Sequence, residues 1–147
     1  MSSRDVSYDA VMARKNEIMK SSMQLDYDDF IQSPIAFDYE GMMQATGYTM
    51  EDIIRIQRDT KVGNTPLLEL KNFTVAVRRI SPPGKGARIF VKDEAANASG
   101  SFKARRAAIS AFDAHKKGYK GMIAATSGNY GAAVASRAAQ RRLKCII

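Results

Sequence analysis

Hydrophobic positions in the first 60 residues recur mostly at helical spacing. Five apolar residues form one such series, and they are Tyr8, Val11, Met12, Ile18 and Met19. Residues 38–46 form a second candidate helix, and Gly47 after them suits a left-handed helix end. Thr49 has the side chain of a helix cap, with Asp52 three residues later, so a further helix is expected to run to about Arg58.

The pattern changes near residue 61. Residues 63–66 carry a turn signal, and an apolar run over residues 67–70 follows. Residues 73–80 fit either a strand or a helix. Residues 87–92 predict a buried strand, and residues 93–101 predict a loop.

An alternation of helices and strands fills the rest of the chain. Residues 101–117 predict a helix stopped by Gly118, with core candidates Phe102, Ala107, Ile109 and Phe112. A strand over residues 121–125, a helix over 130–142 and a strand over 143–147 follow. This order predicts an α/β fold in which a parallel sheet is flanked by helices. Residues 1–60 are therefore expected to form a helical extension and residues 61–147 part of an α/β core.

The last five residues read as the start of a buried strand, with no turn after them. We therefore expect the chain to be the N-terminal part of a longer protein.

Composition excludes several kinds of site. One cysteine, Cys145, rules out an internal disulfide, and one histidine, His115, rules out paired-histidine metal motifs. No apolar stretch is long enough to span a membrane, and no secretory signal is present, so a cytoplasmic location is the default expectation. The net charge is +8, but no nucleic-acid motif accompanies it, so a basic face for anionic ligands or an acidic partner is favoured over nucleic-acid binding.

A first candidate for chemistry is Lys103, in the sequence of residues 99–103. It lies where a loop becomes a helix, next to Arg105 and Arg106. Nearby positive charge, the positive end of the helix and desolvation all favour a neutral amine, which is the form that attacks an aldehyde. The alternative is a solvated lysine on a basic helix face.

A second candidate is the loop of Thr126, Ser127, Gly128, Asn129 and Tyr130, again between a strand and a helix. Amides at a helix N-terminus hold anions, and glycine lets the backbone approach a ligand closely. The loop suits a carboxylate or phosphate, although a well-capped loop without a ligand remains open. Because both loops follow strands of one predicted sheet, we expect them to face each other.

Four ordered motifs, over residues 64–67, 92–94, 100–103 and 127–131, resemble the fold type II pyridoxal-phosphate (PLP) enzymes, the tryptophan synthase β family. The resemblance implies a three-layer αβα fold with PLP as cofactor. It implies that Lys103 forms a Schiff base with PLP, that Thr126, Ser127, Gly128 and Asn129 bind the substrate carboxylate, and that Asn129 also contacts the PLP ring. No metal is implied.

Some positions depart from the family pattern. Ala104 stands where threonine synthases carry aspartate, and Tyr130 occupies a position that is usually threonine and borders the substrate. The family's phosphate-binding loop and the partner of the pyridine nitrogen are expected beyond Ile147. We therefore expect the isolated fragment to be inactive.

Motifs at residues 13–19, 37–40, 47–51 and 62–66 resemble a branch of the family formed by β subunits of a thiolase in ornithine breakdown. This resemblance implies an amino-acid substrate, cleavage by coenzyme A to acetyl-CoA and alanine, a small α subunit and a homodimer. The alternatives are a lyase or synthase like threonine synthase, threonine dehydratase or cysteine synthase, and a non-catalytic module that binds PLP or an amino acid.

Three further features are interpreted as structural. Cys145 in an apolar strand is expected to be buried, and His115 is expected at the surface of a helix end. The methionines of the extension are interpreted as core filler or a subunit contact. Six basic residues would suit coenzyme A phosphates, although a solvated face is the simpler interpretation, and they are Arg78, Arg79, Lys85, Arg88, Arg105 and Arg106.

Overall fold

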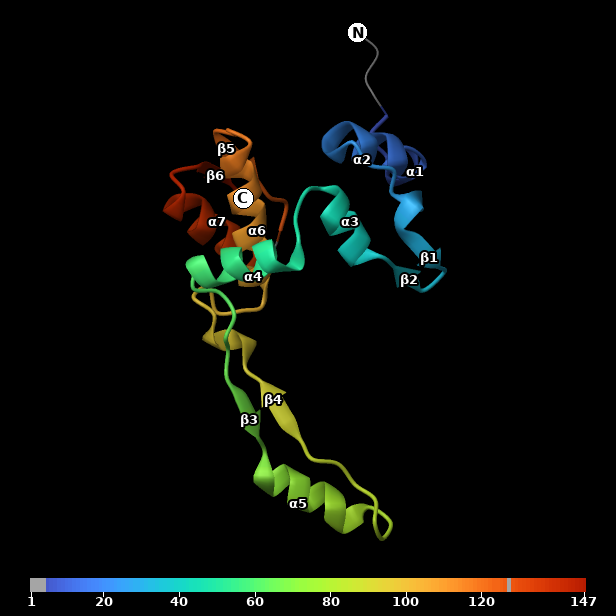
Figure 1. Ribbon diagram of the computed structural model, residues 1–147, viewed down its shortest axis with the longest axis vertical. Coiled ribbons are helices and arrows are strands. Elements are labelled where there is room, and N and C mark those ends of the chain that lie inside the picture. Colours follow the sequence, from blue (N-terminus) through green and yellow to red (C-terminus); the bar gives the residue numbers. More distant parts are fainter. Residues whose placement is uncertain (1–4, 127) are drawn as a thin grey trace. The chain divides into compact units, whose positions relative to one another are not determined.

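The computed structural model describes residues 5–126 and 128–147, and the chain divides into two compact units. The first unit ends at Ile53 and the second runs from Ile54 to Ile147. Helix α4, Met50–Asp59, crosses this boundary (Figure 1).

The first unit contains short helices and one small hairpin. Its elements are α1 (Tyr8–Ala13), α2 (Lys15–Met23), the 3-10 turn η1 (Asp28–Phe30), β1 (Ile31–Ser33), β2 (Ala36–Phe37) and α3 (Tyr39–Ala45). The sequence analysis predicted no strands in this unit, so the hairpin was missed. Aromatic contacts hold it, because the Phe37 ring lies 4.7 Å from the Tyr27 ring and 4.8 Å from the Tyr39 ring, centroid to centroid.

Both predicted helix signals of this unit are confirmed. Asp38 caps α3 by accepting a hydrogen bond from the Gly41 amide at 2.8 Å, and Gly47 follows the helix with φ +83°. At the start of α4 the Asp52 amide donates to Thr49 Oγ1 at 3.1 Å, while the Thr49 amide donates to Asp52 Oδ2 at 3.1 Å. This reciprocal pair is a capping box.

The second unit contains β3 (Leu67–Glu69), α5 (Lys71–Ile80), β4 (Phe90–Lys92), the 3-10 turn η2 (Glu94–Ala96), α6 (Lys103–Lys116), β5 (Gly121–Ile123), α7 (Asn129–Gln140) and β6 (Lys144–Ile146). β3 and β4 pair antiparallel, and Figure 1 shows them as a narrow ribbon with α5 at its far end. Residues 73–80 are thus helical, which decides the alternative that the sequence left open.

Two predictions about the strand at residues 87–92 were wrong. It is shorter, as β4, and its Val91 side chain is exposed rather than buried. It also pairs with β3 rather than with the later strands, so it does not belong to a parallel sheet. Local periodicity cannot reveal this, because a run of apolar residues looks alike in a sheet centre and in a ribbon.

The predicted alternation is confirmed after residue 101. β5 and β6 pair in parallel, with Met122 opposite Cys145. Both side chains pack against the core of Ala107, Ala124, Ala133 and Val134. The opposite face of this sheet carries Ile123, which is 81% exposed, so helices cover only one face among the described residues. The predicted three-layer arrangement is therefore present here as two layers.

Contacts along α6 and α7 show that the two helices run in the same direction. The guanidinium of Arg106 lies 4.7 Å from the Tyr130 ring centroid, near the start of both helices. Near their other ends the Arg141 guanidinium lies 5.0 Å from the Phe112 ring centroid. Since early residues meet early ones and late residues meet late ones, both N-termini lie at one end of this layer.

Arg137 is a buried charge in α7. It is 1% exposed, and its Nη1 donates to the Thr60 carbonyl at 2.8 Å and to Gln140 Oε1 at 3.0 Å. Its Nε and Nη2 are buried without a hydrogen-bond partner. Burial lowers the pKa of this guanidinium. The contact with Thr60 joins α7 to the C-terminal end of α4, where carbonyls lack helical partners.

The burial of several other side chains can be compared with the sequence prediction. Phe102 is 56% exposed and is not part of the core. None of the described methionines of the N-terminal extension is buried, so these residues do not fill a core in this structure. His115 is exposed as expected, whereas Cys145 is only half-buried.

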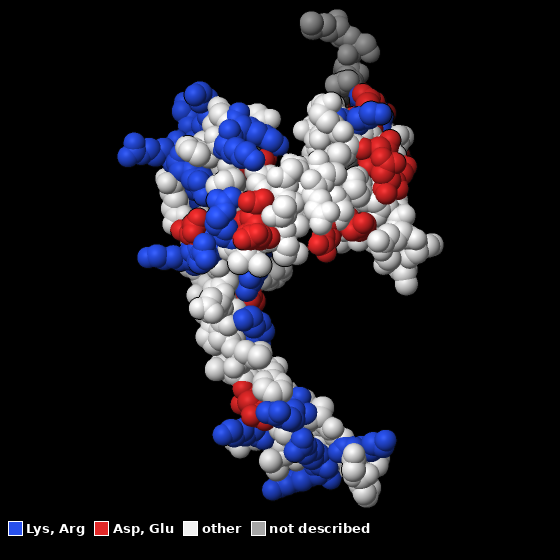
Figure 2. Space-filling model, in the orientation of Figure 1, with Lys and Arg blue, Asp and Glu red and all other residues white. Residues whose placement is uncertain are grey.

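Charge is divided unevenly between the two units. Residues 1–53 contain ten Asp and Glu against four Lys and Arg, while residues 54–147 contain five against 19. Figure 2 shows Lys and Arg side chains gathered over α5 and around α6 and α7. Within the described residues, no helix is long and apolar enough to span a membrane, and no cluster of acidic, histidine and cysteine side chains suits a metal ion.

Replacing Thr49 with alanine is expected to lower the free energy of unfolding by about 1 kcal/mol, because the Asp52 amide loses its cap. Thr49→Ser keeps the hydroxyl and serves as the matched control. Urea unfolding followed by circular dichroism measures both variants, and equal losses in the two would contradict the capping role.

Candidate active site

Lys103 begins helix α6, as the sequence predicted. Gly100 turns the preceding loop with φ +73°, and the Lys103 amide donates to Ser101 Oγ at 3.3 Å. The Lys103 side chain is half-buried, and its Nζ lies 4.1 Å from the centroid of the Phe102 ring. The amine is thus close to an exposed aromatic ring at a helix N-terminus.

The two arginines after Lys103 have partners of their own. Arg105 forms two hydrogen bonds with the Glu94 carboxylate, both at 2.8 Å. Arg106 instead lies over the Tyr130 ring. Of the two positive charges that follow Lys103 in sequence, that of Arg105 is therefore neutralised by Glu94. The guanidinium of Arg106 lies against the second loop instead.

The second loop joins β5 to α7. Thr126 is half-buried, and its Oγ1 accepts a hydrogen bond from the Gly128 amide at 3.3 Å. Asn129 is exposed at the first position of α7, and Tyr130 is half-buried beside it. Ser127, also predicted to bind substrate, lies outside the described residues.

The structure brings the starts of both helices to the same end of the layer, because Arg106 of α6 stacks on Tyr130 of α7. Lys103 precedes Arg106 by one helical turn, and Asn129 adjoins Tyr130. The N-terminal ends of two helices, which are the positive ends of their dipoles, thus lie at the end that carries an amine and an amide side chain. Such an arrangement suits an anionic ligand that also presents a carbonyl.

Gly131 limits the room behind the second loop. A Cβ at this position would lie 2.7 Å from Thr126 Cγ2 and 2.9 Å from Ile147 Cγ2. Thr126 therefore packs directly against the first turn of α7. A side chain at position 131 would displace Thr126 and therefore its hydroxyl.

A network around Glu94 supports the first loop. The carboxylate accepts hydrogen bonds from Arg105, from Thr65 Oγ1 at 2.7 Å and from Asn97 Nδ2 at 2.9 Å. The bonds from Arg105 and then Thr65 lower the pKa of Glu94 to about 2. Because this pKa lies below the ordinary 4.5, the stability from the pairing is complete above pH 4.5 and is lost as pH falls toward 2.

The sequence analysis assigned no role to Glu94, Thr65 or Asn97, and it did not predict that Arg105 pairs with Glu94. The signal was present, because Thr65 and Glu94 stand in two of the four ordered motifs. Only the fold shows that these motifs meet through hydrogen bonds across 29 residues of sequence.

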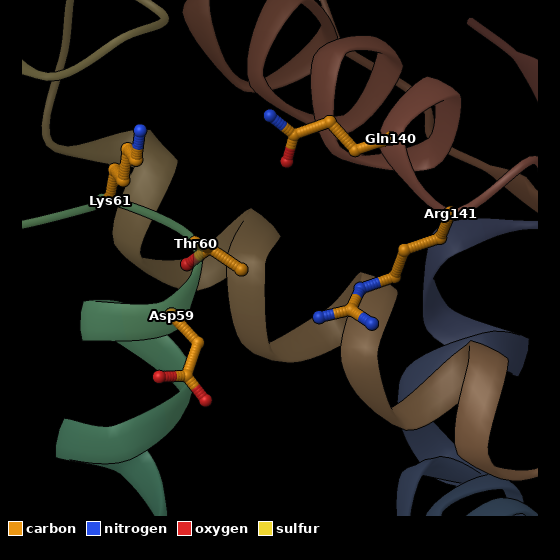
Figure 3. A pocket seen from close by; sticks show the side chains of 5 residues that line it. All are labelled: Asp59, Thr60, Lys61, Gln140 and Arg141. Carbon is orange, nitrogen blue, oxygen red and sulfur yellow. The ribbon is translucent and has the colours of Figure 1, made fainter.

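A pocket of about 350 Å³ lies elsewhere, between the ends of α4 and α7. Figure 3 shows Gln140 and Arg141 reaching from the end of α7 toward Thr60 and Asp59. Lys103 and Asn129 lie near the other end of this layer, roughly 18 Å away along a helix of 12 residues. This pocket is therefore separate from the candidate active site.

Comparisons with known proteins give consistent matches. Residues 59–147 match the family described as "Pyridoxal-phosphate dependent enzyme". The chain is 61% identical over 145 residues to the 2-amino-4-ketopentanoate thiolase beta subunit of Acetoanaerobium sticklandii, covering 99% of this chain and 31% of that protein. A protein of the same name from an unknown prokaryotic organism is 61% identical over 144 residues, covering 98% of this chain and 30% of that protein.

A more distant relative is the threonine synthase of Halalkalibacterium halodurans, 36% identical over 85 residues, which are 58% of this chain and 22% of that protein. No solved structure gives a significant match. The chain spans less than a third of the length of the two thiolase subunits that it resembles.

Replacing Gly131 with alanine is expected to destabilise the second unit by about 1–2 kcal/mol, because the clash with Thr126 exceeds the gain in helix propensity. The matched control is Gly128→Ala, where a Cβ would meet no atom within 4 Å. Chemical denaturation measures both. A Gly131→Ala variant as stable as the original chain would contradict the packing described here.

Proposed function

Because the chain belongs to the family of pyridoxal-phosphate dependent enzymes, we propose that it is the N-terminal part of the β subunit of 2-amino-4-ketopentanoate thiolase, also called 2-amino-4-oxopentanoate thiolase. The proposed reaction transfers the acetyl group of the substrate to coenzyme A and releases alanine. The thiol proton balances the new C–H bond of alanine. This chemistry belongs to ornithine degradation.

The observation that carries this proposal is the extent of the similarity. The two thiolase subunits match almost the whole chain, including the first unit, whereas the family match begins at residue 59. The threonine synthase match covers a shorter stretch at lower identity. The first unit therefore supports a thiolase over a general family member.

The residues present fit a PLP aldehyde and an amino-acid carboxylate. Lys103 supplies an amine at a helix start, and the N-terminal end of α7 supplies the positive end of a helix dipole for an anion. When bound, PLP acts as an electron sink that stabilises negative charge next to the substrate α-carbon.

Lys103 is proposed to have two roles. Through Nζ it would hold the aldehyde carbon of PLP, and the same amine would act as the base for the α-proton of the substrate. Its half-buried position at the start of α6 supports both roles, because the side chain keeps access to a ligand while its backbone is fixed.

The second loop is proposed to bind the substrate. Thr126, Ser127 and Gly128 hold the carboxylate, and Asn129 contacts both the carboxylate and the PLP ring. Tyr130 borders the substrate, and its stacking with Arg106 supports a fixed ring position there.

Further parts of the proposal concern the whole protein. Its partners are coenzyme A, an α subunit and a second β subunit, and its location is the cytoplasm. A third layer covering Ile123 would complete an αβα fold, which the 81% exposure of this side chain supports. Among the basic residues considered for coenzyme A phosphates, Arg88 and Arg105 are paired with glutamates, so they are poor candidates.

Experiments can distinguish the proposed thiolase from two alternatives. A threonine synthase-like lyase or synthase would release a different product without coenzyme A. A non-catalytic module would bind PLP or an amino acid without turnover.

Borohydride reduction of the full-length protein with PLP is expected to place a pyridoxyl group on Lys103, because its Nζ is the amine proposed to hold the aldehyde. Peptide mass analysis locates the label. Lys103→Ala should abolish it, whereas Lys120→Arg, a change at an exposed lysine, should retain it. A label on another lysine would remove Lys103 from the proposed role.

The full-length β subunit with its α subunit is expected to form acetyl-CoA and alanine from 2-amino-4-ketopentanoate only when coenzyme A is present. Chromatography of both products measures this. Asn129→Ala should raise KM for the substrate, because a donor to its carboxylate is lost. Formation of ammonia or a β-replacement product alone would support the threonine synthase-like alternative instead.

A further inference from the structure

The Glu94 carboxylate is fully occupied by donors from three segments. Oε1 accepts from Thr65 and Arg105, and Oε2 accepts from Arg105 and Asn97. Asn97 in turn accepts from the Gly63 amide at 2.8 Å. The four hydrogen bonds on this carboxylate, with the bond from Gly63 to Asn97, tie residues 63–65, residues 94–97 and the first turn of α6 together.

The Arg105 side chain is fixed from several sides. Its Nε and Nη2 bond Glu94, and its Nη1 donates to Gln57 Oε1 at 3.1 Å. A Cβ at Gly63 would lie 2.9 Å from Nη1, so the backbone there lies close to the guanidinium. A planar guanidinium held in this way has little freedom to rotate.

The first turn of α6 has few other side-chain hydrogen bonds that fix its position. Phe102, at the cap position, makes no side-chain capping bond, and the Lys103 amide reaches Ser101 Oγ only at 3.3 Å. Ala104, between Lys103 and Arg105, is fully buried and packs with Val62 and Ala108. The direction in which Lys103 leaves the helix thus depends on Ala104 packing and on the Arg105 pair.

We propose that Glu94 and Arg105 are positioning residues that hold the first turn of α6 so that the Lys103 amine points toward the cofactor. This inference rests on the proposed role of Lys103. It differs from simple stabilisation, because it assigns to the pair the orientation of one amine.

The test uses the full-length protein with its α subunit. Glu94→Gln keeps the shape of the side chain and removes its charge, and Arg105→Met removes all donors. Both are expected to lower kcat by about 10- to 100-fold with little change in KM, because a small displacement of a reacting group costs up to about 100-fold. The rate at which PLP becomes attached to Lys103, measured by borohydride trapping at timed intervals, should fall in parallel.

Two further variants separate positioning from folding. Arg105→Lys keeps the charge but not the paired hydrogen bonds, so its kcat and labelling rate should lie between those of the original protein and Arg105→Met. Glu69→Gln removes the carboxylate of a second glutamate–arginine pair, the exposed pair of Glu69 with Arg88, and should leave both quantities unchanged. Circular dichroism checks that each variant is folded.

Folded Glu94→Gln and Arg105→Met variants that attach PLP to Lys103 and turn over like Glu69→Gln would overturn this inference and leave the proposed function intact. Absence of the label on Lys103 in the unaltered protein would overturn both. A slower attachment to Lys103 with lowered kcat and unchanged KM supports the inference.

Discussion

The pairing of Glu94 with Arg105 is the interaction on which the candidate active site depends. Glu94 lies after β4, and Arg105 lies in the first turn of α6, so their two 2.8 Å hydrogen bonds connect the ribbon to the helical layer. Thr65 and Asn97 satisfy the remaining capacity of the carboxylate. A charged pair of this kind is specific in direction because the guanidinium fork admits few geometries. It therefore orders a loop region that has little apolar core of its own.

The common direction of α6 and α7 is the second constraint. The connection from β5 through α7 to β6 brings the chain back to the end of the sheet at which β5 begins, so the two strands are parallel. Alanines at the facing positions of the two helices let them approach closely, and Ala107 and Ala133 are both fully buried. As a result both helix N-termini, with Lys103 and Asn129, lie at one end. The positive ends of the two helix dipoles favour anions there, which agrees with a carboxylate or a phosphorylated cofactor as ligand.

Much of the local structure followed from residues close together in sequence. The Thr49 capping box, the left-handed Gly47, the helix end at Gly118 and the parallel pairing of the last two strands were all predicted correctly. The errors have one common cause. The strand at 87–92 was predicted to be buried in a parallel sheet, and Phe102 was predicted to lie in the core. Both predictions failed because the apolar character of a residue does not indicate which element will pack against it. The hairpin of β1 and β2 depends on contacts of Phe37 with rings on both sides in sequence, which no period of two or 3.6 reveals.

The sequence by itself determined the family and the identity of the candidate residues, because Lys103 and the loop at 126–130 are short motifs whose chemistry is local. It also determined their place at helix starts, since glycine and polar residues there set the backbone directly. Only the tertiary structure decided that Glu94, Thr65 and Asn97 meet Arg105, and that Arg106 turns toward Tyr130 rather than toward Lys103. These contacts join residues far apart in the chain, and a hydrogen bond or stacked ring is fixed only when the fold brings both partners within a few ångströms.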